Sequence, residues 1–181
     1  MNFIYETDRL HIQILNGTYA AESLRFYEED RELFERYEPL RPVNFYTENY
    51  HRYLLNYEYN LILKGDMVRY WFFPKDDPMR IIGTVSLRNI IHGSYEKCEI
   101  GYKLSSAYQG QGYAREGIAR VIQIAFEEFG LHRIEACCMP GNEASINLLE
   151  SLNFHLEGKL EKYVMIQGHY EDHLLFSLLH S

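Results

Sequence analysis

The apolar positions of this 181-residue chain follow two periods, one typical of strands and one typical of helices. Short segments rich in Val, Ile, Leu and aromatic residues, bounded by turn-forming residues, predict strands. They cover residues 10–14, 68–73, 81–90, 97–104, 132–139, 154–164 and 170–179. A turn around 92–94 joins the third and fourth of these segments.

Apolar residues spaced three or four apart predict helices between the strands. The segment 115–129 has one apolar face with charged residues elsewhere, and a second helix begins after Asn142, whose side chain can cap it. Earlier in the chain, Gly65 is expected to end a third helix. The three apolar faces hold Ile118, Ile122, Ala125 and Phe129, then Leu148, Leu149 and Leu152, and in the early helix Tyr50, Tyr53, Leu54, Tyr57 and Leu61.

The order of these elements predicts a mixed α/β fold. Residues 97–139 form a strand, a helix and a second strand. Because such crossovers are right-handed and return the chain in the same direction, we expect 98–104 and 132–139 to run parallel.

Two glycines, Gly110 and Gly112, lie in the loop that enters the helix 115–129. Glycine permits positive φ angles and a close approach of a ligand to the backbone. A helix start also presents unpaired N–H groups and a partial positive charge, which together favour phosphate. The stretch 98–114 therefore has the arrangement of a diphosphate cradle, although two glycines alone fit an ordinary turn equally well.

Other phosphate-binding loops do not match. The chain has no G-x-x-x-x-G-K-[ST] motif, and the three-glycine dinucleotide motif is incomplete. Gln109, Gly112 and Ala114 instead match the Q/R-x-x-G-x-G/A loop of acyl-CoA-dependent transferases.

With this loop the chain resembles the GNAT N-acetyltransferase superfamily, and within it the RimJ/RimL-like branch that acetylates protein N-terminal amines. Further matches are Thr7-Asp-Arg-Leu10, Glu99-Ile-Gly-Tyr102, His132-Arg-Ile-Glu-Ala136, the N-x-x-S-x-x-x-L-x-x-x-G-F pattern from Asn142 to Phe154, and the segment 168–179. Asn153 stands where the family usually has glycine, and asparagine is the next best residue in a left-handed cap. Residues 15–80 contribute little to the resemblance.

The resemblance implies a GNAT fold over a single domain, residues 1–181. It comprises a mixed central sheet of six to seven strands, about four flanking helices and a strand-helix-strand core that binds acetyl-CoA. The pantetheine arm would lie along Tyr102, Lys103 and Leu104, with the Lys103 N–H near the thioester carbonyl, and Asn142 would contact the arm. The diphosphate cradle would consist of Gln109, Gly110, Gln111, Gly112, Tyr113, Ala114 and Arg115.

The resemblance also implies two catalytic residues. Glu99 lies ten residues before Gln109, the position of the general base in relatives that acetylate lysine, so we expect it to remove the amine proton directly or through water. Glu135 and Glu161 are alternatives, and Glu99 paired with a cation would be purely structural. Ser145 matches a serine thought to assist the leaving thiolate, but a polar residue in a first helical turn commonly satisfies backbone N–H groups instead.

Composition narrows the function classes. The net charge of −8 argues against direct nucleic-acid binding, because such binding depends on Lys and Arg. Three cysteines without a C-x-x-C pair predict buried thiols, and His169 and His173 would lie about 13 Å apart on a strand, so no metal site is expected. We find no long apolar run and no charged-then-apolar leader, which predicts a cytoplasmic protein without a membrane segment.

Three functions remain open at this point. The first is transfer of acetyl from acetyl-CoA to a peptide or protein N-terminal amine. The second is the same chemistry on a small amine such as a polyamine, aminoglycoside or amino acid, and the third is acyl-CoA binding without catalysis. The tyrosines of the early helix form either a packing face or, as in the family, an acceptor groove; a homodimer is possible.

Overall fold

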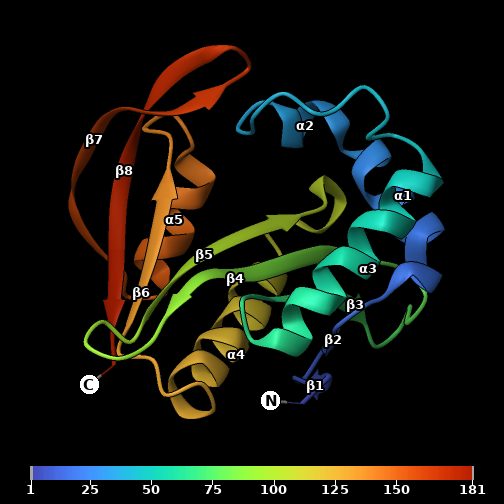
Figure 1. Cartoon of the computed structure of the whole chain (residues 1–181), viewed down its shortest axis with the longest axis horizontal. Helices are drawn as coiled ribbons and strands as arrows, with labels where there is room; N and C mark the ends of the chain where they lie inside the picture. The colour runs from blue at the N-terminus through green and yellow to red at the C-terminus, as the bar shows by residue number, and fades with distance from the viewer. Residues whose placement is uncertain (1, 181) are drawn as a thin grey trace.

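A computed structural model describes residues 2–180 of the chain and contains one mixed sheet over that range. The strand order is β1-β2-β3-β4-β5-β6-β8-β7, and every neighbouring pair is antiparallel except β5 and β6 (Figure 1). The strands are β1 (Ile4–Glu6), β2 (Leu10–Gln13), β3 (Val68–Pro74), β4 (Gly83–Ile91), β5 (Lys97–Leu104), β6 (Arg133–Cys138), β7 (His155–Ile166) and β8 (His169–Leu179).

Helices cover both faces of this sheet, because its strands alternate between two apolar clusters. On β3, Tyr70 and Phe72 pack on the side of α4, whereas Trp71 and Phe73 pack on the side of α1 to α3. The helices are α1 (Ala20–Glu29), α2 (Arg31–Glu35), α3 (Glu48–Lys64), α4 (Tyr113–Glu127) and α5 (Glu143–Ser151), with 3-10 turns η1 (Gly17–Tyr19) and η2 (Ser106–Tyr108).

The predicted mixed α/β class and the crossover are confirmed. Lys97 to Glu99 of β5 pair in parallel with Arg133 to Glu135 of β6. The described residues hold eight strands and five α-helices, slightly more than expected. The extra strand, β1, has three residues with only Tyr5 buried, too few to give a periodic signal.

The helix ends follow the predicted cap chemistry. Asn142 Oδ1 accepts a hydrogen bond from the Ser145 N–H at 3.2 Å, which satisfies one of the free donors of α5. Gly65 ends α3 at φ +80°, and Asn153 adopts φ +64° after α5. Asn153 therefore adopts the left-handed backbone conformation for which the family pattern has glycine at this position.

The predicted packing face of α3 was only partly right: Tyr50, Leu54 and Leu61 are half-buried, but the most buried face lies beside them. Its buried residues include His51 and Glu58, while Tyr53 and Tyr57 are 68% and 50% exposed and stack on each other at 6.1 Å between ring centroids. His51 Nδ1 lies 2.9 Å from the buried Ser23 hydroxyl, and Glu58 forms two hydrogen bonds with Arg69. Because His51 and Glu58 alternate with Leu55 and Ile62 on the buried face, the apolar pattern indicated the neighbouring face instead.

Gly117 brings α4 close to the sheet, and Gly117→Ala is expected to destabilise the fold. A Cβ at this position would lie 2.6 Å from the buried Phe72 ring. Overpacking of a core lowers the free energy of unfolding by about 1–3 kcal/mol, whereas replacing a helical glycine by alanine raises it by at most about 1 kcal/mol. We therefore expect a net loss of stability. A lower urea midpoint would show this effect. Gly141→Ala is the control, because nothing lies within 4 Å of its Cβ position.

No helix within residues 2–180 is both long and apolar enough to cross a bilayer.

Candidate active site

The candidate site begins where β5 and β6 separate. Their pairing stops at Glu99 and Glu135, and beyond this point the two strands diverge (Figure 1). On its other edge β5 stays paired with β4 as far as Leu104. The backbone of residues 100–104 therefore faces an opening on the β6 side, where an extended ligand can add as a further strand.

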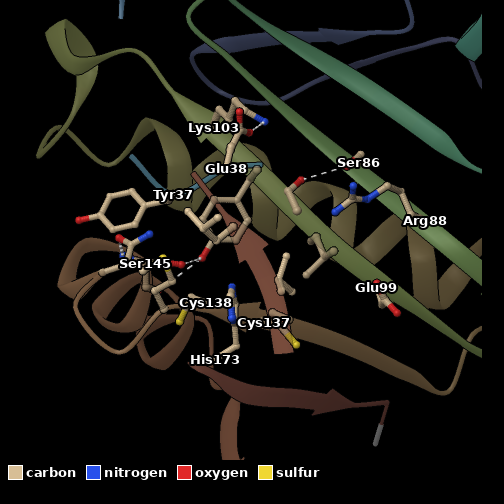
Figure 2. Close-up of a pocket in the computed structure, with 18 of the residues that line it drawn as sticks. Tyr37, Glu38, Ser86, Arg88, Glu99, Lys103, Cys137, Cys138, Ser145 and His173 are labelled. Carbon is tan, nitrogen blue, oxygen red and sulfur yellow. Dashed lines mark hydrogen bonds and ion pairs between the residues drawn. The ribbon is translucent and has the colours of Figure 1, made fainter. Parts of the chain in front are cut away.

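A cavity of about 620 Å³ occupies this opening. Five residues that the sequence predicted for the site line this cavity, and Figure 2 labels Glu99, Lys103 and Ser145 among them. They are Glu99, Tyr102, Lys103, Asn142 and Ser145. Leu104 and the residues from Gln109 to Arg115 do not line the cavity; they follow β5 and lead into α4.

The loop before α4 is open to solvent and has the backbone geometry of an anion site. Gly110 and Gly112 adopt φ +70° and +81°, and Gly112 is the N-terminal cap of α4. Residues 109–112 are exposed. Within residues 2–180, the N–H groups of Gly110, Gln111 and Gly112 donate no hydrogen bond to the protein, so they and the first turn of α4 remain available to a ligand.

Arg9, which in the sequence is only part of the Thr7-Asp-Arg-Leu10 match, holds this loop in place. Its Nη1 donates to the Gln111 carbonyl oxygen at 2.9 Å and its Nε to Glu116 at 2.6 Å, while the guanidinium lies 4.2 Å above the Tyr113 ring centroid. Thr7 donates a further hydrogen bond to Glu116 at 2.5 Å. Residues more than 100 positions apart therefore order the loop, and no local motif could have indicated it.

Ser145 neither caps its helix nor faces bulk water. Its Oγ lies 2.8 Å from the Tyr102 hydroxyl, and both residues line the cavity (Figure 2). Burial raises the pKa of Tyr102 above its ordinary value, although the hydrogen bond between Tyr102 and Ser145 opposes the shift. The phenol is therefore protonated near neutral pH. The side chain of Tyr102 had been assigned no role from the sequence, where only its backbone was considered.

Glu99 reaches the same cavity from β5 and is half-buried. Within the described part of the chain it forms no hydrogen bond and no ion pair. The purely structural alternative, a carboxylate paired with a cation, is therefore not what the structure contains.

The two alternative carboxylates are placed differently. Glu135 accepts hydrogen bonds from Lys97 at 3.0 Å and Arg133 at 2.7 Å. These two cations lower the pKa of Glu135 even though burial opposes them, so it is a poor proton acceptor. The side chain of Glu161 is 79% exposed and lies outside the cavity lining.

At the other end of the cavity lies a group of half-buried charges. The Glu38 carboxylate, in the loop after α2, pairs with both Lys103 and Arg41. Burial and, to a smaller extent, the nearby guanidinium groups together lower the pKa of Lys103 to about 8. Gln167, at the turn between β7 and β8, donates to the Glu35 and Glu38 carbonyls at 3.0 and 3.1 Å and so holds this loop against the hairpin.

The prediction of three buried thiols was only partly right. Cys98 and Cys138 are buried, but Cys137 is exposed and lines the cavity with Cys138. Side chains alternate along β6, so adjacent cysteines cannot both face the core. Although Cys137 is exposed on one side, desolvation by the cavity wall and the nearby Glu99 and Glu135 carboxylates raise its pKa to about 11, so its thiol is protonated near neutral pH.

Comparison with known proteins identifies the family. Residues 9–155 match the Acetyltransferase (GNAT) domain. A probable N-acetyltransferase of Bacillus subtilis, YjcK, is 36% identical over 170 residues, which are 94% of this chain and 93% of that protein.

Solved structures of similar proteins have the same fold over nearly the whole chain. The ribosomal-protein-S5-alanine acetyltransferase of Vibrio fischeri superposes with a TM-score of 0.92 at 30% identity, covering 98% of this chain and 97% of that one. RimJ of Mycobacterium smegmatis, solved with CoA-disulfide, superposes with a TM-score of 0.88 at 25% identity, covering 94% and 81%. The chain thus belongs to the GNAT family of acetyltransferases, in its RimJ/RimL-like branch, and is an acyltransferase.

Proposed function

We propose that this enzyme transfers the acetyl group of acetyl-CoA to the N-terminal amine of a peptide or protein. The observation that carries the proposal is the cavity between the diverging strands, in which an unpaired carboxylate and a hydroxyl pair face the open edge of β5. Its rim includes the exposed residues Pro39, Cys137 and Tyr163, so a chain attached to the reacting amine can continue into solvent. The similarity to an S5-alanine acetyltransferase supports a peptide acceptor.

Acetyl-CoA would occupy both parts of the site. Its diphosphate fits the free N–H groups from Gly110 to Arg115, because these combine unpaired donors with the positive end of a helix dipole. The pantetheine arm would lie along residues 102–104, with Asn142 contacting it from the start of α5. The complex of the related RimJ with CoA-disulfide supports this cosubstrate.

The chemistry follows from these positions. Glu99, directly or through one water, takes a proton from the acceptor ammonium, and the neutral amine attacks the thioester carbonyl. The Lys103 N–H expected for the oxyanion points toward β4, because the Lys103 carbonyl oxygen lies beside Gly83 and the Ser105 N–H donates to Ile82. A backbone N–H of β5 that faces the opening, that of Tyr102 or Leu104, would instead stabilise the oxyanion as the C–N bond forms.

As the C–S bond breaks, Ser145 donates its proton to the coenzyme A thiolate. The nitrogen of the new amide loses its remaining extra proton to water, and Ser145 regains a proton from water through the Tyr102 hydroxyl, which lies 2.8 Å away.

A turnover screen tests this function. The enzyme is incubated with acetyl-CoA and either peptides with free N-termini, the same peptides with blocked N-termini, or small amines, and CoASH release and product mass are recorded. Acetylation of the free N-termini alone supports the proposal. Turnover of small amines alone would assign the second function considered above, and acetyl-CoA binding without any turnover would indicate a non-catalytic protein.

Ser145→Ala is expected to lower kcat by roughly tenfold, because the departing thiolate then takes its proton from water. The change removes only the hydroxyl, and the Ser145 backbone N–H remains capped by Asn142. Tyr102→Phe should have a smaller effect, and the double variant should resemble Ser145→Ala, because the phenol acts through the serine. Fully additive losses in kcat would show that the two hydroxyls act independently.

A further inference from the structure

Arg88 is a charged residue of the cavity that the mechanism above does not use. It lies on β4 directly opposite Glu99 on β5, and both line the cavity. Opposite charges at such cross-strand positions usually pair. Here they do not, and among residues 2–180 Arg88 forms no hydrogen bond or ion pair. Figure 2 shows its guanidinium directed into the cavity, away from the Glu99 carboxylate.

Gly101 provides the room for this orientation. A Cβ at position 101 would lie 3.2 Å from Arg88 Nη2, so the guanidinium lies over the bare backbone of β5. Gly101 does not have a positive φ angle, and its conformation therefore does not require glycine. The missing side chain instead lets the guanidinium lie against the strand that borders the cavity.

The other cations of the cavity are already neutralised. Arg69 donates two hydrogen bonds to Glu58 at 2.8 and 2.9 Å, and Lys103 is paired with Glu38. The described residues that line the cavity include three Lys or Arg side chains. Of these three, Arg88 is the one whose hydrogen-bond donors are all free. A chain with a net charge of −8 presents an unpaired cation at this point.

We infer that Arg88 binds a carboxylate of the acceptor, and that the preferred acceptor is a peptide N-terminus with Asp or Glu at its second or third position. The inference rests on the proposed function. A guanidinium binds a carboxylate through two parallel hydrogen bonds, a match that neutral side chains do not offer. Glu99 on the facing strand would take the amine proton, so amine and carboxylate sites lie side by side. Because one residue spans about 3.5 Å, the second and third side chains are the ones within reach.

The test uses peptides that differ only in one charge. Peptides with Glu at position 2 or 3 are compared with the Gln versions for kcat/KM, and free glutamate and aspartate form a separate arm. For the wild type, kcat/KM should be about tenfold higher with the Glu peptides, which is the effect of one exposed hydrogen-bonded pair of opposite charges. Arg88→Gln should lose this preference, and Arg52→Gln, a solvent-exposed arginine of α3, should retain it. Arg88→Glu should instead favour peptides with Lys at the same position.

The outcomes separate this inference from the function on which it rests. Peptide acetylation without a preference for Glu, or with a preference that survives Arg88→Gln, would overturn the role of Arg88 and leave the proposed function intact. Arg88-dependent acetylation of the free amino acids alone would overturn the peptide acceptor. If no peptide and no amino acid were acetylated, both proposals would fail. Because Arg88 is exposed, melting temperatures close to that of the wild type are expected for its variants.

Discussion

Replacement of Glu99 by glutamine is expected to lower kcat by roughly 100- to 10,000-fold, the usual contribution of a general base. Glutamine has the same size but cannot take a proton from the acceptor ammonium. The affinity for acetyl-CoA should be almost unchanged, because Glu99 lies before the stretch of β5 that holds the pantetheine arm in the proposed complex. Steady-state CoASH release gives kcat, and calorimetry gives the affinity for acetyl-CoA.

The matched control is Glu161→Gln, which changes a carboxylate that lies outside the cavity lining and is 79% exposed. It should leave kcat unaltered. If Glu99→Gln also retained normal turnover, the proton would have to leave through water without this carboxylate. Loss of acetyl-CoA affinity in the Glu99 variant would indicate instead that the substitution disturbs the cofactor site.

An aspartate introduced at Gly110 is expected to weaken acetyl-CoA binding by about 30-fold. No protein atom lies within 4 Å of the Cβ position, so the new carboxylate would face the ligand and solvent alone. Beside a bound diphosphate it would cost about 2 kcal/mol at a dielectric intermediate between protein and water. Calorimetry with acetyl-CoA at low and high salt measures the effect, which should shrink as salt screens the exposed charges.

Gly110→Asn provides the control for this substitution. Asparagine and aspartate have nearly the same shape, and both tolerate the φ of +70° that Gly110 adopts. The asparagine variant should therefore bind acetyl-CoA nearly as well as the wild type. Equal affinities for the two variants would place the diphosphate away from this loop and remove the main support for the proposed cofactor site.

Most elements that build the cofactor side of the site could be predicted from local patterns. The helix that follows the two glycines, the strands on either side of it and their parallel pairing all appear where expected. Such features depend on apolar periodicity, on glycine conformation and on the handedness of the crossover, which act over short stretches of chain. Asn142 and Asn153 also occupy the predicted caps, because capping involves only neighbouring backbone groups.

Other features depended on contacts between distant segments. The most buried face of α3 was missed because partners on other elements, Ser23 and Arg69, satisfy its buried His51 and Glu58. A polar residue with a buried partner cannot be distinguished in sequence from one that faces water. The same reason kept Arg9 from being recognised as the residue that orders the loop before α4.

The sequence by itself determined the mixed α/β fold, the glycine loop at the start of α4 and the family to which the chain belongs. Only the tertiary structure shows which carboxylates are paired: Glu135 contacts two cations, whereas Glu99 lies unpaired opposite Arg88. It also placed the Ser145 hydroxyl next to Tyr102. The physical reason is that local propensity and periodicity fix where elements form, whereas the reactivity of a side chain depends on which charges and hydrogen-bonding groups the fold brings to it from elsewhere in the chain.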